Sequence, residues 1–436
     1  MTPALGIRPG ARRGAASQEA VVELLLIAGW VAEVGAGDRV AAERQAHQTL
    51  DHLVESGLGF HRAASGERFF DPAEVTNFAA WLSLEKGDRF WFDRCVPRSR
   101  WFVWAAHGLA PTTEACPPPP TALPPRRFTV GFQRLFNLNG REPGEAVRLR
   151  LPRPIEDRAL SGLEVRPTPG SGARFTQAEG RLDARVEVPP GLEVELGFEA
   201  AFTAHPSGRE SDAASLDATN LALYTRPRDG MIKVDQTVRN LAADLAGAER
   251  DPWSQVKRFW DFGFDRLRHG VIHYDEIDLA QPTGWALENG WCDCQLGSGL
   301  LAALCRARGI PARLVGGYVM DADTPYQHYW AEAWIEGRGW LPLDLYMSWY
   351  FSKGGRDPAW RDYYFGRLDY RMKTEILPHL FNGPGQLRFP PAWHQLSRLR
   401  DEGLEMSFHD SESGALIHRD RVAIIGGDGD PSPRSR

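Results

Sequence analysis

The sequence predicts an α+β protein in which a helix carrying a cysteine packs on an antiparallel sheet, preceded by a small β-sandwich domain and an N-terminal helical region. Three observations predict this class. Apolar residues recur at helical spacing over residues 19–108. They alternate with polar residues over residues 126–205, as in strands that bury one face. Beyond residue 252 the helical pattern returns and leads into a cysteine-bearing helix that strand-like segments follow.

Residues 1–116 are assigned to the N-terminal helical region. Within it, Asp71 and Pro72 have the form of a helix start, with the aspartate as N-cap and the proline at the first helical position. A run of prolines then predicts an extended linker over residues 117–127, because proline-rich segments favour an open conformation without internal hydrogen bonds.

Residues 128–205 are predicted to form a β-sandwich-like domain, and residues 206–400 the catalytic core with an aromatic-rich C-terminal extension. Residues 401–436 are predicted to be a C-terminal tail, partly disordered, because the chain from Gly426 onward is polar and rich in Gly, Pro and Ser. The alternating apolar residues of the sandwich include Phe128, Val130 and Phe132, then Val147, Leu149 and Leu151, and later Val194, Leu196 and Phe198.

Composition and charge limit the possible partners and compartment. Lys and Arg number 51 against 57 Asp and Glu, so the net charge of −6 favours neither nucleic acid nor an anionic membrane surface as a partner. Five cysteines in 436 residues predict a reducing, cytoplasmic location rather than a disulfide scaffold. The apolar run at residues 21–32 is shorter than the roughly 20 residues that cross a membrane.

Cys294 is predicted to lie in the first turn of a helix that ends near Gly309. The backbone N–H groups and the dipole of a helix start favour a thiolate, whereas an isolated thiol has a pKa of about 8.5. Gly297 and Gly299 cost this helix up to about 1 kcal/mol each relative to Ala. We therefore expect a close neighbour at this turn, namely the strand that carries the histidine. The buried stripe consists of Leu296, Leu300 and Leu304.

His328 and Asp344 are predicted to face each other on a β-hairpin. A strand from His328 to Ile335 is followed by a turn and by a returning strand that contains Asp344. The two residues are 16 positions apart with their midpoint at Glu336, so a hairpin folded there places them opposite each other on one face. A slip of one residue would separate them onto opposite faces.

Cysteine, histidine and aspartate together provide a nucleophile, a base and an orienting carboxylate. His328 would take the proton of Cys294, and Asp344 would fix the tautomer of the ring and support the imidazolium. The thiolate would attack a carboxamide carbon. The backbone N–H of Cys294 is the first donor expected for the oxyanion, and Trp285 and Asn289 are candidates for the second.

Trp330 and Glu332 share the strand face of His328 and are candidates for supporting contacts around the three catalytic residues. For Glu332 a salt bridge to Arg313 is the favoured interpretation. Cys292 leaves open which thiol attacks, although helix phase and motif spacing favour Cys294. The Cys-Asp-Cys run could also form half of a zinc site or a redox pair, but no second cysteine pair exists to complete a tetrahedral site.

These motifs resemble the transglutaminase-like superfamily over residues 253–346. In that family the cysteine lies 15 residues before a Gly-Ile-Pro-Ala-Arg motif, as Cys294 does here. The family's histidine motif usually reads His-Ala-Trp-x-Glu and its aspartate ends a Gly-Trp-x-x-x-Asp run, and this chain has His-Tyr-Trp-Ala-Glu and Gly-Trp-Leu-Pro-Leu-Asp in those places. The resemblance implies a papain-like α+β core, a triad of Cys294, His328 and Asp344, and no metal or other cofactor. Two departures are Cys292, where the family often has Gly, and Leu345, where it often has Pro.

The resulting prediction is a cysteine-dependent enzyme that acts on amide or peptide bonds through a thioester intermediate. It would either hydrolyse the thioester, as a protease or amidase, or transfer the acyl group to an amine, as a transglutaminase does. The alternative is a non-catalytic scaffold or binding protein that keeps the fold. The expected partner is a peptide, protein or small amide substrate, or one carried on a partner protein, and not a nucleic acid or a membrane.

Overall fold

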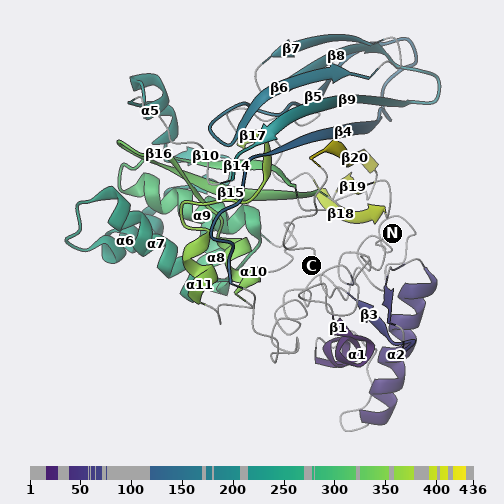
Figure 1. The fold of residues 1–436 in the computed structure, drawn as a ribbon, viewed down its shortest axis with the longest axis horizontal. Helices are drawn as coiled ribbons and strands as arrows, with labels where there is room; N and C mark the ends of the chain where they lie inside the picture. The colour runs from purple at the N-terminus through teal and green to yellow at the C-terminus, as the bar shows by residue number, and fades with distance from the viewer. Residues whose placement is uncertain are drawn as a thin grey trace.

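The elements form three groups, shown in Figure 1: a small N-terminal group, a β-sandwich, and helices packed on a second sheet. The fold confirms the predicted α+β class. The helix start predicted at Asp71 and Pro72 lies outside the described residues. Apart from short gaps inside each range, the computed structural model describes residues 16–27, 39–75, 118–206, 215–320, 325–377 and 392–428.

The N-terminal group combines two helices with a short sheet, which the helical spacing did not predict. Helix α1 contacts α2, and Val21, Leu50 and Leu53 are buried between these elements together with Phe70. The sheet has the order β1-β3-β2, and its strands are too short to carry a detectable period-two pattern. The bounds are β1 (Ala16–Ser17), α1 (Gln18–Ile27), α2 (Arg39–Glu55), β2 (His61–Arg62) and β3 (Arg68–Phe70).

The β-sandwich consists of a six-stranded sheet, in the order β18-β19-β20-β4-β9-β6, and a three-stranded sheet, in the order β5-β8-β7. Phe128, Val130 and Phe132 on β4 are buried between the sheets, while the residues that alternate with them are partly exposed. The bounds are β4 (Arg126–Asn137), β5 (Ala146–Pro152), β6 (Leu160–Pro167), β7 (Arg174–Ala178), β8 (Arg181–Glu187), β9 (Glu193–Ala204), β18 (Ala392–Leu399), β19 (Gly403–Asp410) and β20 (Leu416–Gly427).

The region assigned to a C-terminal tail departs from the prediction, because residues 403–410 and 416–427 form β19 and β20. Strand β20 pairs antiparallel with β4. Its Asp420 is buried and accepts two hydrogen bonds from Arg134, at 2.6 and 2.7 Å. The disorder predicted from Gly426 onward falls mainly on residues 429–436, which lie outside the described residues. The buried Asp420 has a fixed partner inside the sheet, and such pairing makes burial of a charge tolerable.

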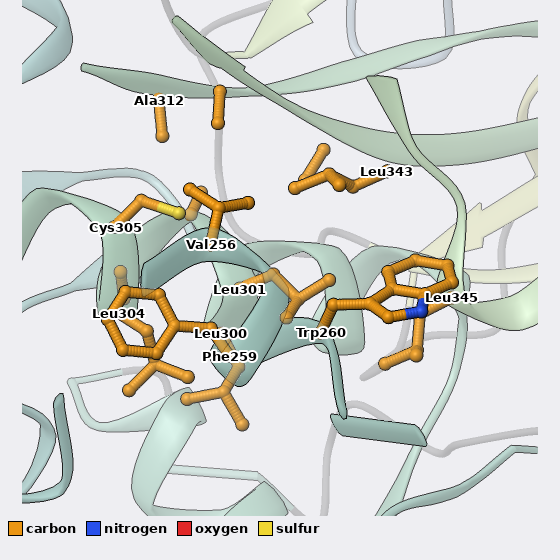
Figure 2. Packing of buried hydrophobic residues seen from close by; sticks show 14 of the residues in the cluster. Val256, Phe259, Trp260, Leu300, Leu301, Leu304, Cys305, Ala312, Leu343 and Leu345 are labelled. Carbon is orange, nitrogen blue, oxygen red and sulfur yellow. The ribbon is translucent and has the colours of Figure 1, made fainter. Parts of the chain in front are cut away.

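The core places helix α9 against strands β14 and β15 of a sheet with the order β16-β15-β14-β17. Figure 2 shows Leu300, Leu301 and Leu304 of α9 beside Val256 and Phe259 of α7. The helices are α5 (Ala218–Tyr224), α6 (Gln236–Ala246), α7 (Pro252–Arg266), α8 (Pro282–Asn289), α9 (Cys294–Ala307), α10 (Leu345–Phe351) and α11 (Pro358–Tyr363). The strands are β10 (Arg228–Asp229), β11 (Ile232–Lys233), β12 (Arg268–His269), β13 (Trp291–Cys292), β14 (Ala312–Val319), β15 (Tyr326–Ile335), β16 (Gly339–Leu343) and β17 (Arg371–Leu377).

The sandwich and the core sheet share one hydrophobic cluster. Phe132 of the sandwich meets the Tyr318 ring of β14 edge-on at 6.5 Å between centroids, and Phe128 meets Tyr370 in the same way at 5.5 Å. Met372 of β17 is fully buried in this cluster. The sandwich therefore supports β14 and β17, which pair with each other, and β14 in turn pairs with β15, the strand that carries His328.

Glu375 of β17 lies buried in this junction. Its Oε2 atom has no hydrogen-bond partner among the described residues. Burial raises the pKa of Glu375 to about 7, against the opposing effect of the Arg134 guanidinium and with a further increase from Asp420. The folded protein therefore holds a proton on Glu375 at pH values where the unfolded carboxyl, with its ordinary pKa of 4.5, has lost it.

We expect the free energy of unfolding to fall by about 3 kcal/mol as the pH rises from about 4.5 to about 7, because the native state binds one more proton than the unfolded state over this interval. Glu375→Gln should abolish this decrease and be more stable than the parent protein at pH 8. Urea unfolding at pH 5 and pH 8 measures both, with Glu199→Gln on the exposed side of β9 as control. If the free energy of unfolding differed between Glu375→Gln and the parent protein by the same amount at pH 5 and pH 8, the expectation would be contradicted.

Candidate active site

The local sequence places Cys294 at the first position of α9. Gly290 ends α8 in the left-handed conformation, with φ of 60°, and the chain then crosses β13. Asp293 caps the new helix, since its Oδ1 accepts the N–H of Leu296 at 2.7 Å. The aspartate directly before the cysteine is the sequence signal for this cap, and it was not used in the prediction.

The environment of the Cys294 thiol opposes ionisation. Burial raises the pKa of the thiol well above its ordinary value, and the carboxylates of Asp293 and Asp344 act in the same direction. Hydrogen bonds from the backbone N–H groups of Tyr329 and Gln295 lower the pKa, but by less. The helix start, which was expected to favour a thiolate, is therefore outweighed, and the resting sulfur carries its proton.

His328 and Asp344 lie within hydrogen-bond distance of each other. The Nε2 atom of His328 is 2.9 Å from Oδ1 and 3.0 Å from Oδ2 of Asp344, and the two side chains are 3% and 0% exposed. The other ring nitrogen of His328 is Nδ1. Cys294 is held close by, because its sulfur receives the N–H of Tyr329, the residue after His328.

The hairpin that joins these residues folds two positions away from the predicted register. Ile335 pairs with Gly339, so the turn is centred on Gly337 rather than on Glu336, and the strand ladder ends at Leu343 opposite Ala331. Gly337 takes φ of 74°, which glycine adopts without a steric penalty. A shift of two residues equals the strand period, so the shared face was predicted correctly although the directly opposed pair was not.

Asp344 has two further partners that the sequence did not reveal. Arg371 donates from Nη2 to Oδ2 of Asp344 at 2.7 Å, and the backbone N–H of Met347 donates to Oδ1 at 3.0 Å. Burial alone would raise the pKa of Asp344, but His328 and the Arg371 guanidinium together hold it below its ordinary value. The carboxylate therefore remains charged across the neutral pH range.

Cys292 faces a different histidine. Its Sγ atom is 3.4 Å from Nδ1 of His269, and both residues are buried. Burial raises the pKa of the Cys292 thiol well above its ordinary value. The ring of His269 lies 5.6 Å from the rings of both Tyr346 and Trp349, so this second cysteine–histidine pair is enclosed by aromatic side chains.

This pair also accounts for a glycine in α9. Strand β15, which carries His328, contacts α9 as expected, but the side chains closest to Gly297 belong to Cys292 and His269. A Cβ atom at Gly297 would lie 2.8 Å from the sulfur of Cys292 and 3.4 Å from Cε1 of His269. At Gly299 the nearest atom would be the Cβ of Met231, at 3.2 Å. The first turn of α9 thus rests on Cys292 and His269.

Gly297→Ala is expected to destabilise the fold by about 1–3 kcal/mol, because the new methyl group would lie 2.8 Å from the buried sulfur of Cys292, and one of the two must shift. Adding Cys292→Ala should recover most of this loss by removing that sulfur. Urea unfolding of the two single variants and the double variant measures the coupling. If the two substitutions changed the free energy of unfolding additively, the contact with the Cys292 sulfur would not be the reason why position 297 requires glycine.

The four supporting candidates lie in different surroundings. Trp330 donates from Nε1 to Glu332 at 3.3 Å, and Glu332 binds Arg313 Nη2 at 2.6 Å and Lys373 Nζ at 2.8 Å. Burial would raise the pKa of Glu332, but the two cations lower it to about 2. Trp285 is half-buried on α8 and packs against the helical core, and the side chain of Asn289 lies outside the described residues.

The described part of the chain offers neither a metal site nor a membrane-spanning helix. No three His, Cys, Asp or Glu side chains within it are grouped so as to hold a metal ion. None of its helices combines the length and the apolar character needed to cross a bilayer.

Comparison with known proteins confirms the resemblance for the region that contains the site. Residues 239–345 match the family model of the transglutaminase-like superfamily. A solved structure of a candidate cysteine protease from Cytophaga hutchinsonii is 13% identical, with 69% of this chain and 98% of that chain covered and a TM-score of 0.40. The periplasmic domain of TgpA from Pseudomonas aeruginosa is 14% identical, with 54% and 92% covered and a TM-score of 0.33. No curated protein matches the chain.

Proposed function

We propose, from the premise that residues 239–345 form a transglutaminase-like core, that the protein is a cysteine-dependent enzyme acting on amide or peptide bonds. Cys294 is the nucleophile, His328 the general base and acid, and Asp344 the carboxylate that orients the ring. The observation that carries this proposal is the buried His328–Asp344 hydrogen bond beside a helix-start thiol. A cytoplasmic location remains part of the same proposal.

The first half-reaction transfers one proton and forms one carbon–sulfur bond. Nδ1 of His328 takes the proton of the Cys294 thiol as the sulfur attacks the carboxamide carbon. The tetrahedral intermediate collapses, the carbon–nitrogen bond breaks, and His328 returns the proton to the departing amine or ammonia. Because burial raises the pKa of the Cys294 thiol well above its ordinary value, the thiol needs His328 as a base to become nucleophilic.

Asp344 contributes by holding the charge that balances the imidazolium. Its two oxygens both face Nε2 of His328, which fixes the proton on that nitrogen and leaves Nδ1 as the base. The backbone N–H of Cys294 is the proposed first oxyanion donor. Trp285 and Asn289 remain proposals for the second donor, and Trp330 and Glu332 support the strand that carries the base.

The second half-reaction releases the acyl group from the sulfur. If water attacks the thioester, the product is a carboxylic acid and the enzyme is a protease or amidase. If an amine attacks, the product is a new amide and the enzyme is a transferase. In both cases His328 accepts the proton of the attacking group, the carbon–sulfur bond breaks, and His328 returns that proton to the departing sulfur of Cys294, which restores the resting thiol and the neutral ring. The substrate is a peptide, a protein or a small amide, free or carried on a partner protein.

Incubation with a library of glutamine-containing peptides, with and without a primary amine, distinguishes these outcomes. Mass spectrometry would show cleaved or deamidated peptide for hydrolysis, and peptide that has gained the amine and lost ammonia for transfer. Peptide mapping of the protein should show an acyl adduct on Cys294 in either case. Absence of every product and of the adduct would instead favour a non-catalytic scaffold.

A further inference from the structure

The Asp344 carboxylate is held from both ends by groups outside the proposed triad. Oδ1 accepts the N–H of Met347 at 3.0 Å, and Oδ2 accepts Nη2 of Arg371 at 2.7 Å, while both oxygens face His328. Arg371 is buried on β17, with its side chain 1% exposed. A rotation of the carboxylate would break at least one of these contacts, so its plane is fixed before any substrate arrives.

Arg371 is itself held by a second carboxylate. Its Nε is paired with Oδ1 of Asp369, and Oδ2 of Asp369 accepts the hydroxyl of Tyr364 at 3.1 Å. The carbonyl oxygen of Tyr364 accepts the backbone N–H of Asp344 at 3.3 Å. These contacts form a closed ring through Asp344, Arg371, Asp369 and Tyr364, and two separate segments of the chain contribute to it.

We propose that Arg371 and Asp369 are positioning residues of the active site, which orient Asp344 and set the charge experienced by His328 and Cys294. This inference rests on the proposed function, since it concerns the proton transfer between those two side chains. Asp344, Arg371 and Asp369 together carry one negative charge. A protonated His328 brings the sum to zero, so the group is neutral in the state that follows proton transfer.

The other titratable groups around His328 come from three elements. Cys294 and its neighbour Asp293 lie on α9 and at its cap, Tyr329 follows His328 on β15, and Tyr346 of α10 has its ring 5.6 Å from that of His328. Trp330 stands between Arg371 and the Glu332 ion pairs, with its ring centroid 5.4 Å from Cζ of Arg371. Among the described groups that these contacts bring to the site, Arg371 is the permanent cation.

Removal of Arg371 should therefore raise the pH at which Cys294 becomes reactive. Arg371→Met leaves two buried carboxylates beside His328, and uncompensated negative charge favours the protonated forms of both the imidazole and the thiol. We expect an upward shift of about one pH unit. Asp369→Asn removes negative charge instead and should shift the profile downward by a smaller amount. The double variant restores the original sum of charges and should return the profile close to that of the parent protein.

The test is the rate at which iodoacetamide alkylates Cys294 between pH 4 and pH 12, followed by peptide mass spectrometry so that the other cysteines do not interfere. If Arg371 had a purely structural role, its loss would lower the fraction of Cys294 that reacts but would not move the pH at which the alkylation rate is half-maximal. The double variant would then react no faster than Arg371→Met. Either result would overturn the proposal, as would an unmoved profile in folded Arg371→Met.

Circular dichroism identifies variants that fail to fold, and Arg371→Lys provides a second variant that keeps the charge but loses the planar fork. It should keep the inflection of the parent protein. Because alkylation needs no substrate, failure of this inference can be distinguished from failure of the proposed function: the inflection would not respond to charge even if peptide turnover were found. A shifted inflection without turnover would support the inference and contradict the enzyme proposal.

Discussion

Cys294→Ala is expected to abolish both amide hydrolysis and acyl transfer, lowering kcat by roughly 10⁶-fold, the size of loss seen when a protease loses its nucleophile. Alanine retains the helix start and the Asp293 cap, but no atom remains that can form the thioester. The measurement is product formation from a peptide that the parent protein converts. The folded fraction should change little, since the substitution removes a single sulfur atom and keeps the helix start with its cap.

Cys292→Ala is the matched control, because this cysteine lies two positions away and faces His269 rather than His328. It should keep kcat within about tenfold of the parent value while losing some stability through the small cavity it leaves. If Cys292→Ala were inactive and Cys294→Ala active, the assignment of the nucleophile would be reversed. Comparable loss in both would indicate a role shared by the two thiols.

Asp344→Asn should lower kcat by about 10⁴-fold with little change in KM, as when the aspartate of a serine protease triad is replaced. An asparagine can still accept a hydrogen bond from His328, but it carries no charge to support the imidazolium and leaves the buried Arg371 with one carboxylate fewer. The measurements are kcat, KM and the alkylation rate of Cys294.

Asp420→Asn is the control for loss of a buried ion pair. Asp420 also accepts two hydrogen bonds from an arginine, Arg134, but in the sandwich. Its replacement should cost stability on the order of 3–5 kcal/mol and leave kcat per folded molecule unchanged. Equal kcat losses in the two variants would show that the effect of Asp344→Asn arises from folding rather than from the site.

The local sequence was sufficient to predict the positions of Cys294, His328 and Asp344 in their helix and strands, because these positions follow from the periodicity of each element. A leucine repeat and a motif spacing located Cys294 at a helix start, and the period of two in strands placed His328 and Asp344 on one face even though the turn was centred on the wrong residue. Which face of the sheet a residue lies on depends only on whether its position along the strand is odd or even. The register of the hairpin depends instead on the conformation of the turn, and here Gly337 sets that conformation by taking a positive φ.

Arg371 could not be predicted in the same way. It lies 27 residues after Asp344, on a strand that pairs with β14 rather than with its neighbours in the chain, and no periodic pattern encodes that choice of partner. The same limit applies to the fold. Asp420 and Arg134 are 286 residues apart, so composition alone assigned the later segment to a tail.

The pairing of β20 with β4 has a consequence for biosynthesis. Residues near 130 leave the ribosome long before those near 420, and at the usual 5–20 residues per second the interval for these 286 residues is roughly 15–60 s. During that time the hydrogen-bonding groups on one side of β4 have no native strand beside them, and unpaired strand edges attract foreign strands. The nascent chain thus completes the segment bearing Cys294 before β20 is available to pair with β4, so this edge of the sandwich sheet stays open to pairing with other strands during synthesis.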